Sequence, residues 1–339
     1  MSNKDYRVAI ALTKQMANSI LDQDVLDLLS SFAEVNPVDQ LPDEITPDVL
    51  KAMVKDADAC ITCWGTPGFT DEILEASPKL KLIAHAAGSI KHMIPASFWG
   101  TGRRITSNAA IIAEDVSHTV LTFMMIHSRG IWQFAKSTRE GNWNGGEAGL
   151  FATRRLEGLT VGIVGASHVG KSLIKLLKPF GCKLNLYDPV VPAIEAAALG
   201  VNQMELDELI ASSDVLTLHA PAIESCRHLI NKDNLKLLKD GALFINTARG
   251  MVVDEVALIE ELKTGRFFAC IDVTDPEPPR VDHPFRKMDN VILVPHIAGG
   301  HTVDIRKSLG QCAAMEIYNY RHRGSLTNEV RLEMLSHMA

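Results

Sequence analysis

The chain has 339 residues, of which 46% are hydrophobic and 22% are charged, and its formal net charge is −7. This length is sufficient for two domains that each bury a core, and the acidic balance argues against nucleic acid or an anionic membrane as the main partner. The N-terminal apolar run is too short for a signal peptide, and we expect no segment with the roughly 20 apolar residues of a membrane span. These features predict a soluble, cytoplasmic protein.

The six cysteines are scattered along the chain, apart from Cys60 and Cys63 in the segment DACITCWG. A pair spaced in this way can hold a metal or perform redox chemistry, but no second ligand pair follows it. We therefore interpret it as the end of a buried strand and expect no metal site.

In the first 110 residues, short apolar segments alternate with helical patterns, which is typical of a parallel α/β domain. A long helical pattern follows over residues 116–136, and a segment rich in Gly and Asn over residues 139–155 predicts a loop or a domain boundary. The strand-like segments are 7–12, 58–64 and 79–87, and the helix-like ones are 21–32 and 70–78.

The alternation begins again after Leu159 and is more regular. The strands are almost continuously apolar, which predicts a sheet that helices cover on both faces. A last helix is expected from Thr302 to about His322. The expected strands are 160–165, 183–188, 215–221, 242–250, 267–273 and 290–295.

Residues 165–172 read GASHVGKS and match two different patterns. As G-x-x-x-x-G-K-[ST] they form a phosphate loop of the kind found in ATPases, for which Asp272 could help to hold magnesium. As G-x-G-x-x-G they form a dinucleotide-binding loop in which Ser167 replaces the middle glycine. The second pattern requires an acidic residue about 20 positions later, at the end of the next strand, and Asp188 stands there. We therefore favour the dinucleotide loop.

Asp188 also indicates which dinucleotide binds. A carboxylate at this position accepts a hydrogen bond from the ribose 2′-hydroxyl and repels a 2′-phosphate. No arginine follows it in DPVVPAIE. The sequence therefore predicts NAD rather than NADP as the cofactor.

Three polar residues follow strands in this second half: Arg249 in NTARG, Glu277 in DVTDPEPP and His296 in PHIAGG. Because ligands of open parallel sheets bind at the carboxyl ends of the strands, these side chains are expected at one edge. Arginine can hold and polarise a keto acid, histidine can transfer a proton near neutral pH, and a carboxylate can orient the histidine. Each residue alone could equally be structural or solvated, but the three together predict reduction of a carbonyl group.

The ordered motifs GxxxxG, LYD, LHAP, NTARG, DVTDPEP and PHIAGG resemble those of the D-isomer-specific 2-hydroxyacid dehydrogenases, and the similarity is strongest from Leu156 to about Arg306. The resemblance implies two doubly wound parallel-sheet α/β domains. These are a flavodoxin-like substrate domain, residues 1–109 plus 302–339, and a Rossmann NAD-binding domain, residues 110–301. It further implies a dimer packed through the NAD-binding domain and a small 2-oxo or 2-hydroxy acid as substrate.

The resemblance also implies roles for individual residues. Arg249 would bind the substrate, His296 would be the general acid in reduction, and Glu277 would orient His296 and favour its charged form. Asp188 would hold the adenosine ribose and Asp272 the carboxamide of the nicotinamide. The complete set of cofactor-binding candidates is Gly165, Ser167, His168, Val169, Gly170, Asp188, His219, Ala220, Pro221, Thr247, Ala248, Asp272 and Gly299.

The chain departs from the family pattern in two places. The substrate loop, which usually carries Gly-x-Gly, reads HAAGS, so Ala87, Gly88 and Ser89 are the candidates for substrate binding. Val116, Ser117 and His118 stand where the family often has Val-Ala-Glu, and His118 is either close to the site or a structural helix residue. A second functional hypothesis remains open, because NAD-sensing corepressors share the fold and the motifs.

Overall fold

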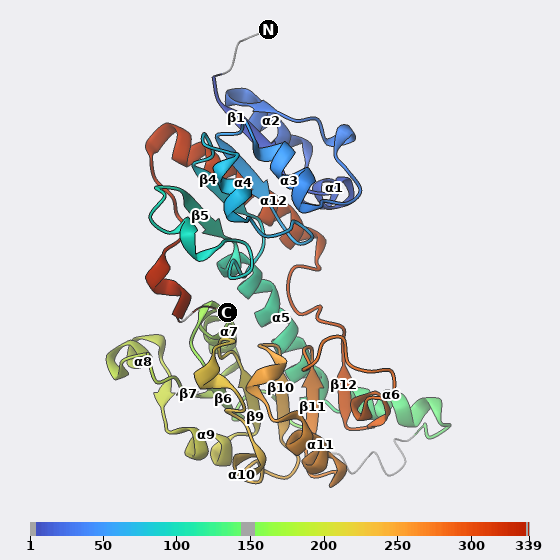
Figure 1. The fold of residues 1–339 in the computed structure, drawn as a ribbon. Helices are drawn as coiled ribbons and strands as arrows, with labels where there is room; N and C mark the ends of the chain where they lie inside the picture. Colours follow the sequence, from blue (N-terminus) through green and yellow to red (C-terminus); the bar gives the residue numbers. More distant parts are fainter. Residues whose placement is uncertain (1–4, 144–152, 337, 339) are drawn as a thin grey trace. The chain divides into compact units, whose positions relative to one another are not determined.

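The computed structural model describes residues 5–143, 153–336 and 338. The chain divides into two compact units: unit 1 is Met1–Ile112 with Gly300–Ala339, and unit 2 is Ala113–Gly299. The sequence analysis placed these boundaries at 109/110 and 301/302, a few residues away. Each unit contains one sheet of its own (Figure 1).

The sheet of unit 1 has the order β13-β5-β4-β3-β1-β2, in which only the short β13 is antiparallel to its neighbour. The order 2-1-3-4-5 of the parallel strands is that of flavodoxin-like folds. Successive side chains of β1 enter two different cores, Val8 and Ile10 on one face and Ala9 on the other, so the sheet is covered on both faces. The strands are β1 (Arg7–Ile10), β2 (Glu34–Val35), β3 (Ala59–Thr62), β4 (Leu82–His85), β5 (Arg104–Ser107) and β13 (Glu329–Val330).

The helices of unit 1 begin at side-chain caps that the sequence provides. The Thr13, Asp22 and Thr302 side chains each accept a hydrogen bond from a backbone N–H in the first turn of the helix that follows. The backbones of α12 and α1 approach closely, because a Cβ atom at Gly310 would collide with the carbonyl oxygen of Ile20. The helices are α1 (Lys14–Ile20), α2 (Gln23–Phe32), α3 (Pro47–Val54), α4 (Asp71–Glu75) and α12 (Val303–Arg323).

The sheet of unit 2 has seven strands, all parallel, in the order β12-β11-β10-β9-β6-β7-β8. When β6 is counted as the first strand of this unit, the strands β6 to β11 have the order 3-2-1-4-5-6 of the Rossmann fold. The predicted fold class is therefore confirmed for both units. The strands are β6 (Thr160–Val164), β7 (Lys183–Tyr187), β8 (Asn202–Gln203), β9 (Val215–Leu218), β10 (Leu243–Asn246), β11 (Phe268–Ile271) and β12 (Val291–Leu293).

The prediction of a single helix over residues 116–136 is wrong. The first helix ends at Ser128, and a second begins at Ile131 after Gly130, whose φ of +60° places it in the left-handed region. Glycine enters that region without steric cost and so allows the chain to turn there. The helices of this part of the chain are α5 (Ala109–Ser128), α6 (Ile131–Arg139), α7 (His168–Leu177), α8 (Ala193–Leu199), α9 (Leu206–Ser212), α10 (Lys232–Leu235) and α11 (Glu255–Lys263).

Helix α5 begins at Ala109, seven residues before the expected start, and by length and composition alone it could cross a membrane. A core helix of a globular protein passes the same test, and α5 carries the buried polar residues Asp115 and Ser117. The Ser117 hydroxyl hydrogen-bonds that of Ser172 at 3.0 Å, and Thr119 donates to the carbonyl of Ala298 at 2.9 Å. These contacts are those of a helix packed within a protein core.

Candidate active site

Unit 2 places His296 just after β12 in an unusual backbone conformation. Its φ is +52°, and its backbone N–H donates to the carbonyl of Asp272, at the end of β11, at 2.9 Å. Few residues other than glycine adopt a positive φ, and such residues concentrate at functional sites. The positive φ therefore indicates that His296 belongs to a functional site.

The imidazole of His296 forms a close pair with Glu277. Nδ1 of His296 lies 2.6 Å from Oε1 of Glu277, and the two side chains are 46% and 39% exposed. A histidine held through Nδ1 by a carboxylate presents Nε2 to its surroundings. The structure therefore brings together the two residues that the sequence analysis had placed in one site.

The Asp272 carboxylate fixes the loop that contains His296. Its Oδ1 accepts hydrogen bonds from the backbone N–H groups of Ile297 at 2.7 Å and Ala298 at 3.2 Å, and the residue is only 3% exposed. Burial raises the pKa of Asp272, against the lowering effect of these two hydrogen bonds. The sequence analysis predicted Asp272 as a cofactor-binding residue but missed these contacts, because they depend on how β11 and β12 are paired.

Arg249 lies at the carboxyl end of β10, where Asn246 holds its backbone. The Asn246 amide donates to the carbonyl of Arg249 at 3.1 Å and accepts from the N–H of Ala248 at 3.1 Å. Burial lowers the pKa of Arg249, whereas the charges of Glu277 and Asp272 raise it. An arginine remains charged in such a setting. Asn246 was not among the predicted site residues, although an asparagine at the end of a strand is a sequence signal for such a role.

Arg249, Glu277 and His296 thus follow neighbouring strands and interact electrostatically. The half-buried Arg249 cation can bind a carboxylate and polarise a carbonyl group. A histidine paired with a carboxylate can donate or accept a proton. This combination of groups can add a proton to a carbonyl oxygen and remove it in the reverse direction.

The glycine loop between β6 and α7 is tightly packed at two points. Gly165 has a φ of +97°, and a Cβ atom there would lie 2.9 Å from the carbonyl carbon of His219. A Cβ atom at Gly170 would collide with the carbonyl oxygen of Gly165. The Ser167 hydroxyl donates to the carbonyl of His219 at 3.2 Å. Both glycines are therefore required sterically, and serine at position 167 gains a contact within the protein.

The first turn of α7 lies directly after this loop. Ser167 and His168 are exposed and Val169 is half-buried, so the N-terminal end of the helix is accessible. Backbone N–H groups at such an end favour an anionic group such as a phosphate. Lys171 does not serve a phosphate loop here, because its ammonium group pairs with the Glu195 carboxylate at 2.7 Å.

Asp188 directly follows β7 and contacts the glycine loop. One carboxylate oxygen accepts from the N–H of Ala166 at 2.8 Å, and the other accepts from those of Val190 at 2.9 Å and Val191 at 3.3 Å. The carboxylate thereby connects the glycine loop to the end of β7. This position agrees with the acidic residue that the dinucleotide pattern requires.

Two buried polar atoms near the carboxyl ends of β9 and β10 have no hydrogen-bond partner among the described residues. They are Nδ1 of His219 and Oγ1 of Thr247, in residues that are 5% and 8% exposed. Burial lowers the pKa of His219 to about 3, so its ring is neutral. Buried polar groups without partners are costly and indicate an additional group that binds there. With the glycine loop and Asp188, they form a set of donors and acceptors that suits a dinucleotide.

The remaining candidates lie near these residues along the chain. Ala220 and Pro221 follow His219, Ala248 follows Thr247, and Gly299 is the last residue of unit 2. In unit 1, Ala87, Gly88 and Ser89 follow β4, and the N–H of Asn108 donates to the carbonyl of Ala87 at 2.9 Å. His118 is exposed on α5, and its Nδ1 is 2.7 Å from the carbonyl oxygen of Glu114, which is a local helix contact.

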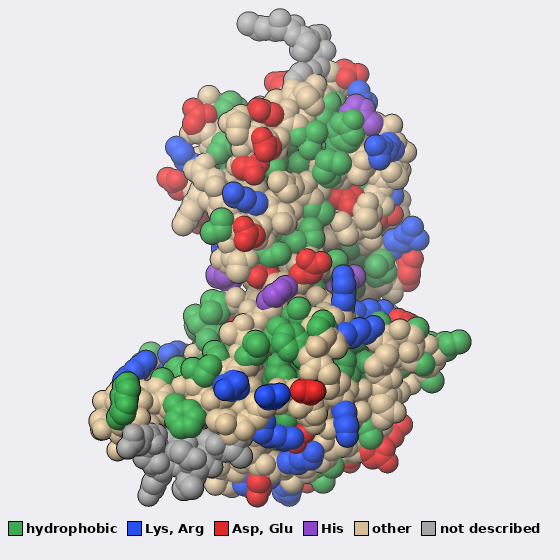
Figure 2. All heavy atoms as spheres, turned by 180° about the vertical axis from the view of Figure 1, so that it is seen from behind, with side chains coloured by type: hydrophobic (Ala, Val, Ile, Leu, Met, Phe, Trp, Pro, Cys, Tyr) green, Lys and Arg blue, Asp and Glu red, His purple; other side chains and the backbone are tan. Residues whose placement is uncertain are grey.

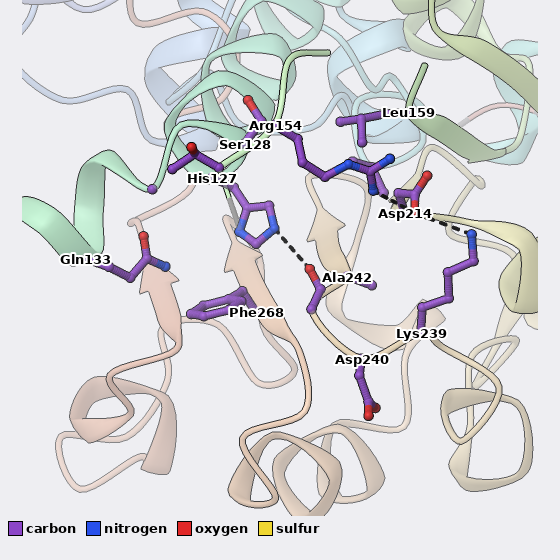
Figure 3. A pocket seen from close by; sticks show the side chains of 14 residues that line it. His127, Ser128, Gln133, Arg154, Leu159, Asp214, Lys239, Asp240, Ala242 and Phe268 are labelled. Carbon is purple, nitrogen blue, oxygen red and sulfur yellow. Dashed lines mark hydrogen bonds and ion pairs between the residues drawn. The ribbon is translucent and has the colours of Figure 1, made fainter. Parts of the chain in front are cut away.

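A cavity of about 210 Å³ lies elsewhere in unit 2 (Figure 3), among residues next to the amino ends of β9, β10 and β11. The Asp214 carboxylate in its wall pairs with Arg154 at 3.1 Å and Lys239 at 3.3 Å, and Nε2 of His127 lies 3.3 Å from the carbonyl oxygen of Gly241. These charges are therefore already compensated. Since catalytic residues of such folds follow the carboxyl ends of strands, this cavity is separate from the candidate active site.

The fold and the site define an NAD-binding oxidoreductase, and the comparisons with known proteins give the family. Residues 121–298 match the family described as "D-isomer specific 2-hydroxyacid dehydrogenase, NAD binding domain". The chain belongs to this family, whose members act on CH–OH groups with NAD. This assignment confirms the resemblance that the ordered motifs indicated.

Relatives and solved structures agree with this assignment. The chain is 30% identical to the hydroxypyruvate reductase of Thermotoga maritima over 86% of this chain and 93% of that protein. It is also 30% identical to the D-3-phosphoglycerate dehydrogenase of Methanocaldococcus jannaschii over 94% of this chain, but it spans only 59% of that longer protein. A phosphoglycerate oxidoreductase from Rhizobium etli shares the fold, with a TM-score of 0.79 at 24% identity, over 96% of this chain and 98% of that one.

Proposed function

We propose that the protein is an NAD-dependent D-2-hydroxyacid dehydrogenase that reduces a small 2-oxo acid and oxidises the corresponding hydroxy acid. The observation that carries this proposal is the His296–Glu277 pair, together with the charge of Arg249, at the carboxyl ends of strands in the unit that contains the dinucleotide loop. The same end of the sheet also carries the two unpaired buried atoms of His219 and Thr247.

In this mechanism the Arg249 guanidinium binds the carboxylate and carbonyl oxygens of the substrate. Nε2 of protonated His296 donates a proton to the carbonyl oxygen of the substrate. A reduced nicotinamide, when bound, would supply the hydride that this reduction requires. Glu277 holds the ring through Nδ1 and compensates its positive charge, since the two atoms are 2.6 Å apart. In the oxidation direction, neutral His296 accepts the proton of the hydroxyl group.

The cofactor is bound by the residues that the glycine loop and its neighbours supply. His168 and Val169 offer N–H groups to the pyrophosphate, and Asp188 accepts from the adenosine ribose. Thr247 and Asp272 serve the nicotinamide end, where the unpaired hydroxyl of Thr247 supports this assignment.

The relatives indicate the size of the substrate. Similar proteins are named hydroxypyruvate reductase, glyoxylate reductase and D-3-phosphoglycerate dehydrogenase. All three names refer to 2-oxo acids or hydroxy acids of two or three carbons. We therefore propose a short, polar 2-oxo acid as the substrate of this protein.

The test is NADH consumption with glyoxylate, pyruvate, hydroxypyruvate, 2-oxobutyrate, oxaloacetate, 2-oxoisocaproate and phenylpyruvate. The proposal predicts turnover of one or two of the short acids, and slow turnover of the two bulky ones. If NADH binds but none of the acids is reduced, the proposed activity is wrong. The alternative of an NAD-sensing corepressor, which the comparisons do not favour, would then have to be reconsidered.

We also propose that the protein is a homodimer in the cytoplasm and that α6 contributes to the dimer interface. Ile131 and Trp132 of α6 are 53% and 44% exposed, and Met125 at the end of α5 is 44% exposed. Figure 2 shows that hydrophobic side chains are exposed on one face of the molecule, interspersed with charged ones. An exposed apolar surface of this kind commonly marks an interface.

Analytical ultracentrifugation tests the dimer. Trp132→Glu is expected to give monomers at micromolar concentration, because it places a charge in the apolar interface. Ile194→Glu, at an equally apolar and 83% exposed position on α8, is the matched control and is expected to leave the dimer intact. A wild-type protein that sediments as a monomer would contradict this proposal.

A further inference from the structure

The loop that carries Glu277 is bound at both ends by one carboxylate. Glu255 is the first residue of α11, after the N-cap Asp254. Its Oε1 lies 2.9 Å from Nε2 of His283, and its Oε2 accepts from the backbone N–H of Asp275 at 3.4 Å. Asp275 and His283 flank Glu277 in the chain, so this contact closes the loop on both sides of it.

The pair of Glu255 and His283 is sheltered from solvent. The two side chains are 16% and 12% exposed, in contrast to the more exposed pair of Glu277 and His296. Ion pairs and hydrogen bonds that are shielded from water are less screened than those at the surface. The contact can therefore hold the loop in one position.

The orientation of His283 is fixed by its other nitrogen. Nδ1 accepts a hydrogen bond from the backbone N–H of Phe285 at 3.4 Å, so the ring proton is on Nε2 and points to Glu255. The ring of His283 also packs against that of Phe285, with centroids 4.8 Å apart, and Phe285 is 2% exposed. His283 is thus anchored to the core of unit 2.

The same loop is packed against the segment that carries Arg249. A Cβ atom at Gly250 would collide with the carbonyl group of Thr274, so the two backbones are in direct contact. The start of α11, the Arg249 segment and the Glu277 loop therefore form one continuous assembly. Glu255 contacts this assembly at Asp275, two residues before Glu277 in the chain.

We propose that Glu255 and His283 are positioning residues that hold Glu277 against His296. This inference rests on the proposed function, because it assigns the pair an effect on proton transfer by His296. Neither residue contacts the reacting atoms. Their effect passes through the distance between Glu277 and His296, as happens when an outer residue orients a functional side chain.

The test compares Glu255→Ala with the wild type in two measurements. The first is the pH dependence of kcat in the reduction of the best 2-oxo acid. The second is the titration of the His296 ring by NMR of protein labelled at the histidine Cε1, with the His296 signal identified from its loss in His296→Asn. The charged groups that face this ring in unit 2 are Glu277 and Asp272, and Arg249 faces both of these carboxylates.

We expect Glu255→Ala to lower kcat by about tenfold to a hundredfold, the range found when outer-shell partners are removed. The affinity for NADH and the KM of the 2-oxo acid are expected to stay within about twofold, because uniform binding is not affected. With Glu277 displaced, the charged ring of His296 is less favoured, so activity is lost at lower pH on the alkaline side and the NMR titration shifts the same way.

Three variants make the comparison specific. Glu255→Gln retains an oxygen that can accept from His283 and is expected to recover part of the lost activity. His283→Phe retains the ring contact with Phe285 but loses the hydrogen bond, and it is expected to resemble Glu255→Ala. Glu260→Ala removes an exposed carboxylate of the same helix, paired with Lys263, and is expected to behave as the wild type.

The outcomes separate this inference from the proposed function. If Glu255→Ala and Glu255→Gln keep the wild-type kcat and pH profile while Glu277→Gln loses activity, the positioning role is wrong and the proposed function stands. If the wild type reduces no 2-oxo acid, the proposed function fails, and the NMR titration decides the positioning role alone. An unchanged titration of His296 in both Glu255 variants overturns it, and a shift to lower pH supports it.

Discussion

The Asp188 carboxylate accepts three backbone hydrogen bonds at the end of β7 and still stands where a ribose would be bound. Its negative charge is the feature that distinguishes NAD from NADP, because it repels a 2′-phosphate. The three hydrogen bonds hold the carboxylate at this position and limit its movement away from a phosphate. We therefore propose that cofactor preference depends on Asp188, whose carboxylate the surrounding backbone fixes.

Asp188→Asn removes the charge and retains an oxygen acceptor. We expect the ratio of kcat/KM for NADPH to that for NADH to rise by about tenfold or more, which corresponds to about 1.4 kcal/mol. Asp207→Asn, at an exposed position in the first turn of α9, is the control and is expected to leave the ratio unchanged. A wild type that already prefers NADPH would contradict the role given to Asp188.

The residues of the site differ in how well they could be predicted from the sequence. Arg249, Glu277 and His296 were found because each lies in the segment that follows an apolar strand, and their order along the chain is a strong signal. The contacts of Asp272 with Ile297 and Ala298, and those of Glu255 with His283 and Asp275, depend on strand pairing and on the path of a loop. No periodicity of the sequence encodes such contacts.

At the scale of elements, continuous apolar runs predicted β1, β3 and β4 of unit 1 and β6, β7 and β9 to β12 of unit 2, because buried parallel strands have this pattern. The strands β2, β5, β8 and β13 were not predicted. The break between α5 and α6 was not predicted either, since apolar residues continue across Gly130 with helical spacing. What ends α5 is the left-handed backbone of a single glycine, and glycine also occurs within helices. The boundary between α5 and α6 thus depends on the backbone conformation of Gly130, which the hydrophobic pattern does not indicate.

The packing of α12 on α1 offers a test at the same scale. Gly310→Ala is expected to reduce the free energy of unfolding by about 2 kcal/mol or more, because the added methyl group meets the backbone carbonyl of Ile20, which cannot move away easily. Gln311→Ala, the exposed neighbour on the same helix, is expected to change it by less than about 0.5 kcal/mol. Urea denaturation followed by circular dichroism measures both. Equal stabilities for the two variants would show that the helices are not in close contact.

At the scale of the whole molecule, buried histidines make stability depend on pH. Burial, with a smaller effect of His92, lowers the pKa of His85 on β4 to about 3. Its ring is neutral in the folded protein but takes up a proton on unfolding below its ordinary pKa of about 6.5. The contribution of the neutral His85 ring to the free energy of unfolding is therefore complete above pH 6.5 and is lost as the pH falls towards 3.

At pH 5 this linkage is expected to cost unit 1 about 2 kcal/mol relative to pH 7, since 1.5 pH units correspond to about 2 kcal/mol for one group. His85→Gln removes the titrating ring, so its free energy of unfolding is expected to decline less between pH 7 and pH 5. The comparison uses the slope of stability against pH rather than its absolute value. Identical slopes for the variant and the wild type would show that His85 is not neutral in the fold.

We propose that His296 transfers the proton, and steady-state kinetics of His296→Asn test this role. Asparagine is the suitable replacement because it tolerates the positive φ of this position while lacking a titrating group. In His296→Asn, kcat for the best 2-oxo acid is expected to fall by about 10²-fold to 10⁴-fold, while the affinity for NADH is expected to stay unchanged. If His296→Asn retains the wild-type kcat with NADH bound, the histidine does not transfer the proton and the proposed mechanism is wrong.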